Sequence, residues 1–521
     1  MCLGKDSVEM GYALKAEEMK AYDRDTIQRI GIPSMVLMER AALSAVQTFD
    51  ELGLKSERVL IVAGTGNNGG DGLALGRLLA ERGAKVTFYM EGSLEKMTEE
   101  TRIQRKILEN SGFSIQSKLE DGEYDMVIDA LFGIGLSREI TGSLRAIVEQ
   151  INLLKEQGAT VCSLDIPSGI CADDGRILGC GVRADITITF AWVKRGHLFY
   201  PGREYTGRLF VKDIGITEKS FISRKPTAFY YEKQELGRLL PERKKSGNKG
   251  TFGKVLLIAG SRDMCGACVL AGSGVLRAGA GMLKIITPVC NREIIQQALP
   301  EAMLYTFEEM PEEEKLQESI KWADVIVVGP GMGMGEASHL LMERVLEKQR
   351  MIVIDADGLN LLASDDDLWQ KAKENSADEN MILTPHPGEM MRLLKKDMTK
   401  YQGCQETLAR ELSEMLSCTV AAKDAVTLVV ANRREEIYIN TSGNDGMATA
   451  GSGDVLAGII GGLLAQGMKS FEAASLGVYL HGLSGEVAAE RKGRFGMLAG
   501  DIAEAVATVT LGNDKNICRF L

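Results

Sequence analysis

The chain has 521 residues, more than one hydrophobic core usually supports, so two domains are expected. It is 45% hydrophobic and 26% charged, as in ordinary globular proteins, and its net charge of −11 disfavours nucleic acid or an anionic membrane surface as the main partner. The ten cysteines are scattered and the four histidines do not cluster, which disfavours zinc and favours reduced thiols. Neither a secretion signal nor a membrane-spanning stretch is recognisable, so the expected location is the cytoplasm.

The first half of the chain alternates short apolar runs with amphipathic stretches. Two helices, Ala16–Ile30 and Met35–Leu52, come first and are separated by Gly31-Ile32-Pro33. Strand–helix alternation then predicts a parallel sheet with helices on both faces. The expected strands are Val59–Ala63, Lys85–Met90, Met126–Ala130, Val161–Ile166, Ile186–Phe190 and Leu209–Val211, with helices such as Leu73–Arg82 and Leu144–Gln157 between them.

The loop Gly64–Gly72, G-T-G-N-N-G-G-D-G, follows the first of these strands and precedes a helix. It is too rich in glycine, asparagine and aspartate for a plain tight turn, and its position indicates backbone wrapped around a ligand at the carboxyl edge of the sheet. Further strands end in Asp129, in Asp165-Ile-Pro-Ser168-Gly169 and in Asp185–Arg195. Such edge aspartates can also simply cap loops, but two carboxylates with Asn68 and the Ser168 hydroxyl form an all-oxygen set suited to a hard cation such as K⁺.

A polar stretch at about Thr217–Tyr230 separates the halves, after which strand–helix alternation resumes with different loop motifs. We therefore expect two unlike domains rather than a duplication. The strands expected in the second half are Lys254–Ala259, Met282–Ile286, Val325–Val328, Ile352–Asp355, Met381–Thr384, Thr419–Ala422 and Thr427–Val430, and its helices include Gly266–Gly281, Gly453–Gln466 and Ser470–Arg491.

The stretch Asn440–Gly458, N-T-S-G-N-D-G-M-A-T-A-G-S-G-D-V-L-A-G, carries the most specific signal in the chain. Ala450–Gly453 leads into a helix, and small residues at a helix N-terminus let backbone N–H groups approach an anion. Asp454 could be a helix cap, but it also suits a base that takes a proton from a hydroxyl while the loop stabilises a transferring phosphoryl group.

Three other segments of the second half accompany this stretch. Gly329–Gly333 closes one strand, and Thr384-Pro-His386-Pro-Gly-Glu389 holds a histidine rigidly between two prolines. Lys423–Thr427 lies between two strands, where its lysine could meet a phosphate or could belong to a solvated turn.

The motifs N-N-G-G-D-G, D-A-L-F-G-I-G-L and D-I-P-S-G resemble the NAD(P)H-hydrate epimerase family, the YjeF N-terminal domain, over about residues 13–216. The resemblance implies a Rossmann-like domain that interconverts the R and S forms of hydrated NADH and NADPH. It also implies that Asp165 acts at the reacting end and that K⁺ is bound by Asn68, Asp129 and Ser168. The implied hydrate site consists of Asn67, Asn68, Gly69, Gly70, Asp71, Gly133, Ile134, Gly135, Leu136, Ser137, Arg138, Glu139 and Asp165.

The motifs G-P-G-M-G, T-P-H-P-G-E and N-x-x-G-N-D-G-M-A-T-x-G-S-G-D-V-L-A-G resemble the NAD(P)H-hydrate dehydratase family, of ribokinase-like fold, from about Leu236 onward. The resemblance implies that Asp454 is the catalytic base, with ADP as co-substrate, ATP as the alternative nucleotide, and Mg²⁺. Asp424 and Ala450 stand where the family usually has glycine. The implied hydrate contacts are Ala267, Gly333, His386 and Asp454, and the implied nucleotide contacts are Lys423, Asp424, Ala425, Val426, Thr427 and Gly453.

The expected fold class is α/β with two domains, an N-terminal Rossmann-like three-layer αβα domain (residues 1–218) and a C-terminal ribokinase-like αβα domain (residues 233–521), joined by a linker (219–232). The expected function is bifunctional repair of hydrated NADH and NADPH, with dehydration at the expense of ADP. Small molecules are the expected partners, without nucleic acid or membrane, and the protein is expected to be a homo-oligomer. Two alternatives remain: a vitamin-precursor kinase of the ribokinase superfamily, and a first half that is a non-catalytic binding module.

Overall fold

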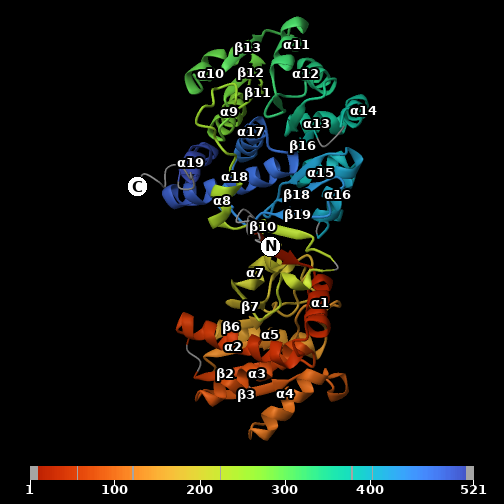
Figure 1. Cartoon of the computed structure of the whole chain (residues 1–521), viewed down its shortest axis with the longest axis vertical. Helices are drawn as coiled ribbons and strands as arrows, with labels where there is room; N and C mark the ends of the chain where they lie inside the picture. The colour runs from red at the N-terminus through yellow and green to blue at the C-terminus, as the bar shows by residue number, and fades with distance from the viewer. Residues whose placement is uncertain are drawn as a thin grey trace. The chain divides into compact units, whose positions relative to one another are not determined.

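The computed structural model describes residues 10–54, 57–119, 122–222, 224–376, 380–401 and 403–511. The chain divides into two compact units, one from Gly11 to Ala228 and one that contains the chain from Phe229 onward (Figure 1). Each unit has a largely parallel sheet covered by helices, which is the α/β organisation expected from the sequence.

The sheet of the first unit has the strand order β4-β3-β2-β5-β6-β7-β9, and all its neighbours are parallel. The chain runs from β2 to one side and returns to the other at β5, so the topological switch point lies between β2 and β5. The strands are β2 (Arg58–Ala63), β3 (Lys85–Met90), β4 (Ile115–Gln116), β5 (Met126–Ala130), β6 (Thr160–Leu164), β7 (Ile186–Phe190) and β9 (Arg208–Lys212). Outside this sheet, β1 (Met10–Leu14) pairs in parallel with β8 (Val193–Lys194).

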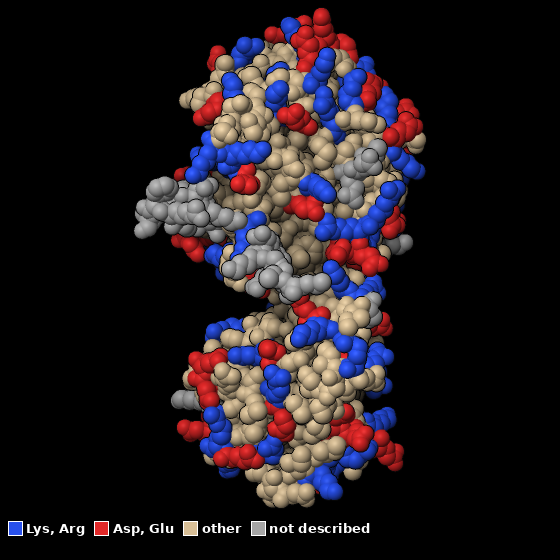
Figure 2. Space-filling model, viewed as in Figure 1, with Lys and Arg blue, Asp and Glu red and all other residues tan. Residues whose placement is uncertain are grey.

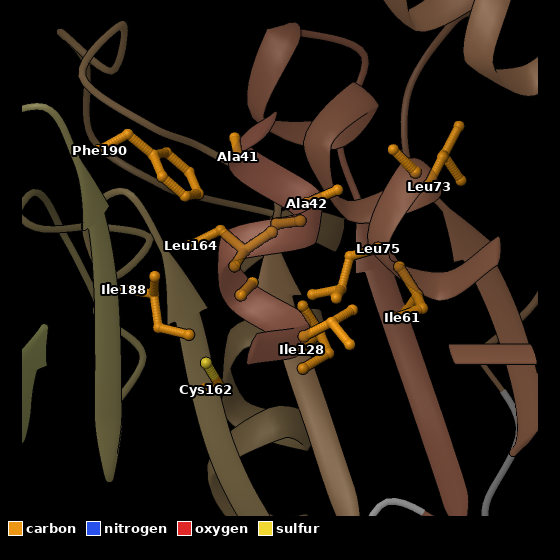
Figure 3. Close-up of a cluster of buried hydrophobic side chains, with 14 of the residues drawn as sticks. Ala41, Ala42, Ile61, Leu73, Leu75, Ile128, Cys162, Leu164, Ile188 and Phe190 are labelled. Atoms are coloured by element: carbon orange, nitrogen blue, oxygen red, sulfur yellow. The ribbon is translucent and has the colours of Figure 1, made fainter. Parts of the chain in front are cut away.

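The core of the first unit lies where helices pack against this sheet (Figure 3). Ile61, Ile128 and Ile188 project from three strands toward Ala41 and Leu75, which come from two helices. The helices are α1 (Ala16–Asp25), continued by a π-helical turn at Thr26–Ile30, α2 (Ser34–Leu52), α3 (Asn67–Glu81), α4 (Glu99–Asn110), α5 (Ser143–Glu156), α6 (Arg195–Leu198) and α7 (Gly202–Thr206), with 3₁₀ turns at Leu94–Lys96 and Glu218–Ser220.

In the second unit, seven parallel strands in the order β13-β12-β11-β14-β15-β16-β17 are extended by the antiparallel strands β18 and β19, with β10 beside β19. The switch point of this sheet lies between β11 and β14. The strands are β10 (Ala228–Tyr231), β11 (Lys254–Ile258), β12 (Met282–Pro288), β13 (Met303–Phe307), β14 (Val325–Val328), β15 (Met351–Ile354), β16 (Met381–Leu383), β17 (Thr419–Ala422), β18 (Leu428–Ala431) and β19 (Ile437–Ile439).

Glycines set the closest helix packing in the second unit. The helices are α8 (Leu236–Leu239), α9 (Cys265–Arg277), α10 (Arg292–Ala298), α11 (Glu313–Trp322), α12 (Glu336–Leu346), α13 (Asp357–Ser364), α14 (Asp366–Asn375), α15 (Pro387–Leu393), α16 (Gln405–Met415), α17 (Ser452–Ala465), α18 (Ser470–Lys492) and α19 (Ala499–Leu511), with 3₁₀ turns at Lys233–Glu235, Val289–Asn291, Met398–Lys400 and Asp445–Met447. A Cβ at Gly458 of α17 would lie 2.0 Å from the Ala271 carbonyl oxygen of α9, and one at Gly274 of α9 would lie 2.4 Å from the Val455 carbonyl oxygen of α17. The small residues of α9 therefore bring two helices together, which fixes the N-terminus of α17.

Three local expectations from the sequence are wrong. Asn67–Gly72 forms the first turns of α3 rather than a loop, because the N–H groups of Gly69 and Gly70 donate to the Gly66 carbonyl at 2.9 and 3.3 Å. The strand expected at Val161–Ile166 ends at Leu164, because Asp165 turns into the left-handed region with φ of 64°. The helix expected at Ala16–Ile30 becomes π-helical after Asp25.

The distribution of charged side chains on the surface and the state of the cysteines agree with the composition. Basic and acidic side chains are interspersed on the face shown in Figure 2. The eight cysteines in the described residues are free thiols, including Cys265 and Cys268, which form a C-x-x-C pair on α9. Among the helices that the structure describes, none has the length and apolar composition needed to cross a bilayer.

Candidate functional sites

The first unit has a cavity of about 570 Å³ at the carboxyl edge of its sheet, next to the β2–β5 switch point. A volume of this size falls in the range of small-molecule sites. Asp165 lies in this cavity with Lys194, and Asp71 reaches it from the second turn of α3. Apolar side chains of α1 and α2 complete the wall, among them Met19 and Leu37.

Asp165 is held as a carboxylate by a buried lysine. Its Oδ1 lies 2.5 Å from Nζ of Lys194, whose side chain is 1% exposed, and the Ile134 N–H donates to its Oδ2 at 3.3 Å. Burial alone would raise the pKa of Asp165, but the charge and hydrogen bond of Lys194 outweigh it and lower that pKa. Lys194 Nζ also donates to Thr189 Oγ1 at 2.7 Å, so the pair is rigidly placed.

A buried histidine supports the strained backbone of Asp165. His197 Nδ1 accepts the Lys194 N–H at 3.1 Å, so its Nε2 carries the proton and donates to the Asp165 carbonyl at 2.9 Å. Burial lowers the pKa of His197 to about 3, which keeps the ring neutral in this role. A left-handed, non-glycine residue costs of order 1–3 kcal/mol, so its presence at the cavity indicates a functional position.

Asp129, Ser168 and Asn68, the oxygen set expected for K⁺, come from β5, the loop after β6 and α3. Asp129 is fully buried and accepts hydrogen bonds from Ser168 Oγ at 2.6 Å and from the Ser168 N–H at 2.8 Å. Both polar atoms of the buried Asn68 side chain lack a partner among the described residues. Orphaned buried amide atoms are costly, so the unpaired Asn68 carbonyl fits a hard-cation ligand.

Two further carboxyl groups share the cavity with Asp165. Burial raises the pKa of Asp71 well above its usual range, and the charges of Asp165 and Asp23 add to this shift. Burial also raises the pKa of Asp23, with Glu100 and Asp165 contributing. Burial thus favours the protonated form of Asp71, whereas Lys194 favours the ionised form of Asp165, and such a divergent pair can donate and accept protons at one substrate.

The other residues expected in the hydrate site are not all at the cavity. Asn67, Gly133, Ile134, Gly135 and Leu136 line it. A Cβ at Gly69 would lie 1.9 Å from the Gly64 carbonyl oxygen and one at Gly70 would lie 2.7 Å from Met38 Cε, so these glycines serve close packing. Ser137, Arg138 and Glu139 are exposed and do not line the cavity. Lys194, which follows β7 at the same edge, also lines the cavity, although no motif assigned it to the hydrate site.

In the second unit, Asp454 lies in the first turn of α17. The loop that leads into this helix requires glycine at position 451. Gly451 has φ of 90°, and a Cβ there would lie 2.4 Å from Leu270 Cδ1. Burial raises the pKa of Asp454 to about 7, with the charge of Asp355 adding to this shift and Lys423 opposing it. A carboxyl group with that pKa suits a general base near neutral pH.

Lys423 lies directly beneath this loop. Its Nζ donates to Asp355 Oδ1 at 2.7 Å, and a Cβ at Gly453 would lie only 3.1 Å from that Nζ. Burial opposes the charge on Lys423, but Asp355 and Glu389 outweigh it and raise its pKa, so the lysine stays protonated. The structure thus brings together Lys423 and Gly453, which are both expected to contact the nucleotide. The Lys423 ammonium lies next to the backbone N–H groups at the start of α17, and both kinds of group can bind phosphate.

His386 and Gly333 approach the same region from two strand ends. His386 Nδ1 accepts the Gly388 N–H at 3.0 Å, and burial lowers its pKa, so it is neutral with the proton on Nε2. The Gly333 N–H donates to Asp357 Oδ2 at 2.8 Å, and the charge of Asp357 in turn raises the pKa of Asp454. Ala267 lies on α9 against the same loop, because a Cβ at Gly331 would lie 2.8 Å from its Cβ.

The two positions that depart from the family pattern adopt conformations that other residues tolerate. Neither Asp424 nor Ala450 has a positive φ. Asp424 accepts hydrogen bonds from the Ala425 N–H at 2.7 Å and from the Tyr401 hydroxyl at 2.9 Å, so its carboxylate is occupied by its own loop. Val426 points into the core, whereas Thr427 is partly exposed and anchors the loop through its carbonyl, which accepts the Asn440 N–H at 2.9 Å.

Several residues near Asp454 received no role from the sequence. Asp355 follows β15 and Asp357 begins α13, Glu389 lies beside His386 with a pKa that burial raises to about 7, and His481 of α18 lies 3.2 Å from the Ser452 hydroxyl. Position at a strand end marks the first two in the sequence, but no local motif marks His481. Within the described ranges, no three His, Cys, Asp or Glu side chains gather closely enough to hold a metal ion by themselves.

A Rossmann-like unit with a small-molecule cavity and a unit with a kinase-like anion loop define a two-domain α/β enzyme. The family profile described as NAD(P)H-hydrate dehydratase matches residues 255–508, and the one described as YjeF-related protein N-terminus matches residues 34–196. The chain is 37% identical to the bifunctional NAD(P)H-hydrate repair enzyme Nnr of Moorella thermoacetica, over 97% of this chain and 98% of that relative. It therefore belongs to the family of bifunctional NAD(P)H-hydrate repair enzymes.

Other similar proteins share the two-unit organisation or only the second unit. The enzyme of the same name from Escherichia coli K12 is 32% identical over 94% of this chain and 92% of its own length. A crystal structure of the ADP/ATP-dependent NAD(P)H-hydrate dehydratase of Bacillus subtilis, co-crystallised with ATP/Mg²⁺, is 28% identical with a TM-score of 0.47, and covers 55% of this chain and 98% of that chain.

Proposed function

We propose that this chain repairs hydrated NADH and NADPH at two sites. Residues 1–218 epimerise the R and S hydrates, and residues 233–521 dehydrate the S hydrate at the expense of ADP, with the stretch 219–232 joining them. Membership of the repair-enzyme family supports both activities. The observation that carries the proposal is Asp454, a partly buried carboxyl group with a pKa near 7, placed at an anion loop beside Lys423.

Dehydration uses the phosphoryl-transfer geometry of the second unit. Asp454 takes the proton of the hydrate hydroxyl, which attacks the terminal phosphorus of ADP and releases AMP. The N–H groups around Gly453 and the Lys423 ammonium stabilise the charge of the transferring group. The ring nitrogen then expels phosphate to give an iminium ion, and loss of a proton from the neighbouring ring carbon restores the dihydronicotinamide. Mg²⁺, which is bound in many proteins by one or two carboxylates together with substrate phosphates, would neutralise phosphate charge beside Asp355 and Asp357.

The pH dependence of dehydration follows from Asp454. The active form is the carboxylate, so kcat/KM for the S hydrate should rise with pH and level off above about pH 7. Epimerisation should not show this rise, because the pKa of Asp165 is lowered rather than raised. Initial rates of both reactions between about pH 6 and 8 test this difference. A flat profile for dehydration would exclude Asp454 as the titrating base.

Epimerisation requires the C–O bond at the hydrated carbon to break and to re-form on the other face of the ring. Its cationic intermediate is stabilised by the ionised Asp165, which is held by Lys194. The protonated Asp71 can supply a proton to the departing hydroxyl, which Asp165 can then help to shuttle back. K⁺, bound by Asn68, Asp129 and Ser168, would supply fixed positive charge that orders the loops around the hydrate.

The K⁺ assignment predicts the behaviour of Asn68→Ala. Losing the unpaired carbonyl oxygen should raise the K⁺ concentration for half-maximal epimerisation by about tenfold or more. K⁺ should also raise the Tm of the natural chain but not that of the variant. Both are measured at constant ionic strength with choline chloride as the balancing salt. An equal response of the natural chain and the variant to K⁺ would place the cation elsewhere.

The nucleotide, the cellular location and the assembly complete the proposal. We assign ADP as the preferred phosphoryl donor over ATP, the cytoplasm as the location and a homo-oligomer as the assembly, with hydrated cofactors and nucleotides as the partners. Incubating the S hydrate with either nucleotide and following the absorbance of the reduced cofactor tests the first point. Phosphorylation of an alcohol without recovery of that absorbance would instead favour a vitamin-precursor kinase carrying a non-catalytic first unit.

A further inference from the structure

A second cavity, of about 440 Å³, lies at the carboxyl edge of the second unit's sheet. It is formed by the ends of β11, β12 and β13 and by the start of α12, and it includes the β11 side of the topological switch point. Crevices at switch points of open α/β sheets are where such folds bind ligands. None of the residues assigned above to hydrate or nucleotide lines this cavity.

The cavity borders a strand end that carries part of the dehydration site. Met332 lines it, and the next residue, Gly333, donates its N–H to the Asp357 carboxylate near Asp454. Gly260 also lines it, and a Cβ at Gly260 would lie 3.1 Å from Cβ of Cys268. β14 is the strand that leads to Gly333, and it is the neighbour of β11 in the sheet. The end of β11, which lines the cavity, therefore lies about 5 Å from the end of β14.

The position of the nucleotide decides which part of the substrate reaches this cavity. In phosphoryl transfer the attacking and leaving oxygens lie on opposite sides of the phosphorus atom. Lys423 follows β17, three strands from β14 on the side away from β11. With the nucleotide on the β17 side, the hydrate approaches from the β11 side, where the rest of its dinucleotide can extend over β11 to β13.

The lining of the cavity has the chemistry of an adenosine phosphate site. Ile258, Ile286 and Phe307 give it an apolar floor on which an adenine ring can pack. Arg262 lies at its rim and makes no hydrogen bond or ion pair with any residue that the structure describes, which leaves its guanidinium available for phosphate. Glu308 and Glu309 at the opposite wall are suited to ribose hydroxyls.

We infer that this cavity binds the adenosine half of the hydrated dinucleotide during dehydration, with Arg262 on its phosphate. The inference rests on the proposed dehydratase function and deepens it, because it makes the second nucleotide of the substrate a source of binding energy. Hydrated reduced nicotinamide mononucleotide, which carries the reacting ring but lacks the adenosine half, separates the two claims.

Two variants of the full chain test the inference, Arg262→Ala, which removes the cation, and Ala337→Trp, which fills the cavity from the first turn of α12. Each should raise the KM for the S hydrate of NADH by about tenfold, the effect of one charge-assisted hydrogen bond or of a blocked site. The KM values for the mononucleotide hydrate and for ADP should stay unchanged. Arg277→Ala, at the exposed opposite end of α9, is the matched control and should change none of them.

The outcomes distinguish the inference from the function on which it rests. If the natural chain restores both hydrates and the two variants leave the dinucleotide KM unchanged, or raise it equally for both hydrates, the adenosine subsite is wrong and the dehydratase stands. If the natural chain restores neither hydrate, the proposed function fails and the subsite fails with it.

Discussion

Asp454→Asn should abolish nucleotide-dependent dehydration of the S hydrate, with a loss of about 10²- to 10⁴-fold in kcat, because the amide cannot take the hydroxyl proton. The substitution keeps the shape of the side chain and removes a buried charge that burial and Asp355 disfavour, so the fold should persist. The loss is measured as the rate of recovery of reduced-cofactor absorbance with saturating ADP.

Epimerisation by the same variant is the internal control, since Asp165 and Asp454 belong to different units. It should proceed at the rate of the natural chain. Asp366→Asn, at an exposed aspartate in the second unit, should leave both activities intact. Loss of both activities in a folded Asp454→Asn variant would count against two independent sites.

Asp165→Asn should lower epimerisation by about 10²-fold or more, because it removes the anion that faces the cationic intermediate and leaves Lys194 buried without its partner. Dehydration of the purified S hydrate should remain, whereas an R hydrate should accumulate. Chromatographic separation of the two epimers over time measures the loss directly.

A structural explanation of that loss is separable from the chemical one. Lys194→Met with Asp165→Asn removes both buried charges, so it should recover stability relative to Asp165→Asn alone without recovering epimerisation. Asp50→Asn, at an exposed aspartate of α2, is the matched control and should epimerise normally. Full epimerisation by Asp165→Asn would remove Asp165 from the mechanism.

The sheet strands were predictable because buried parallel strands read as continuous apolar runs bounded by glycine and aspartate. Met126–Ala130 and Val325–Val328 were predicted with the bounds that the structure has. The motifs also placed Asp165 at a strand end and Asp454 at a helix start, which is where the structure has them. What the alternation could not show is the switch in strand order that opens the cavities beside β2 and β11.

The remaining features depend on contacts between distant segments. Lys194 neutralises Asp165 across 29 positions of sequence, and Asp355 raises the pKa of Asp454 across 99. No local pattern encodes such pairs. The exposure of Ser137, Arg138 and Glu139 was likewise invisible, because a motif marks a segment and not which of its side chains turns inward.

One measurement tests the two-site account most directly: purified R hydrate of NADH is incubated with the chain, and reduced-cofactor absorbance is followed before and after ADP is added. The account predicts no recovery before ADP, because the first site only interconverts epimers, and full recovery after ADP, because the R form is converted and then dehydrated. Recovery without a nucleotide, or none with ADP or ATP, would contradict it.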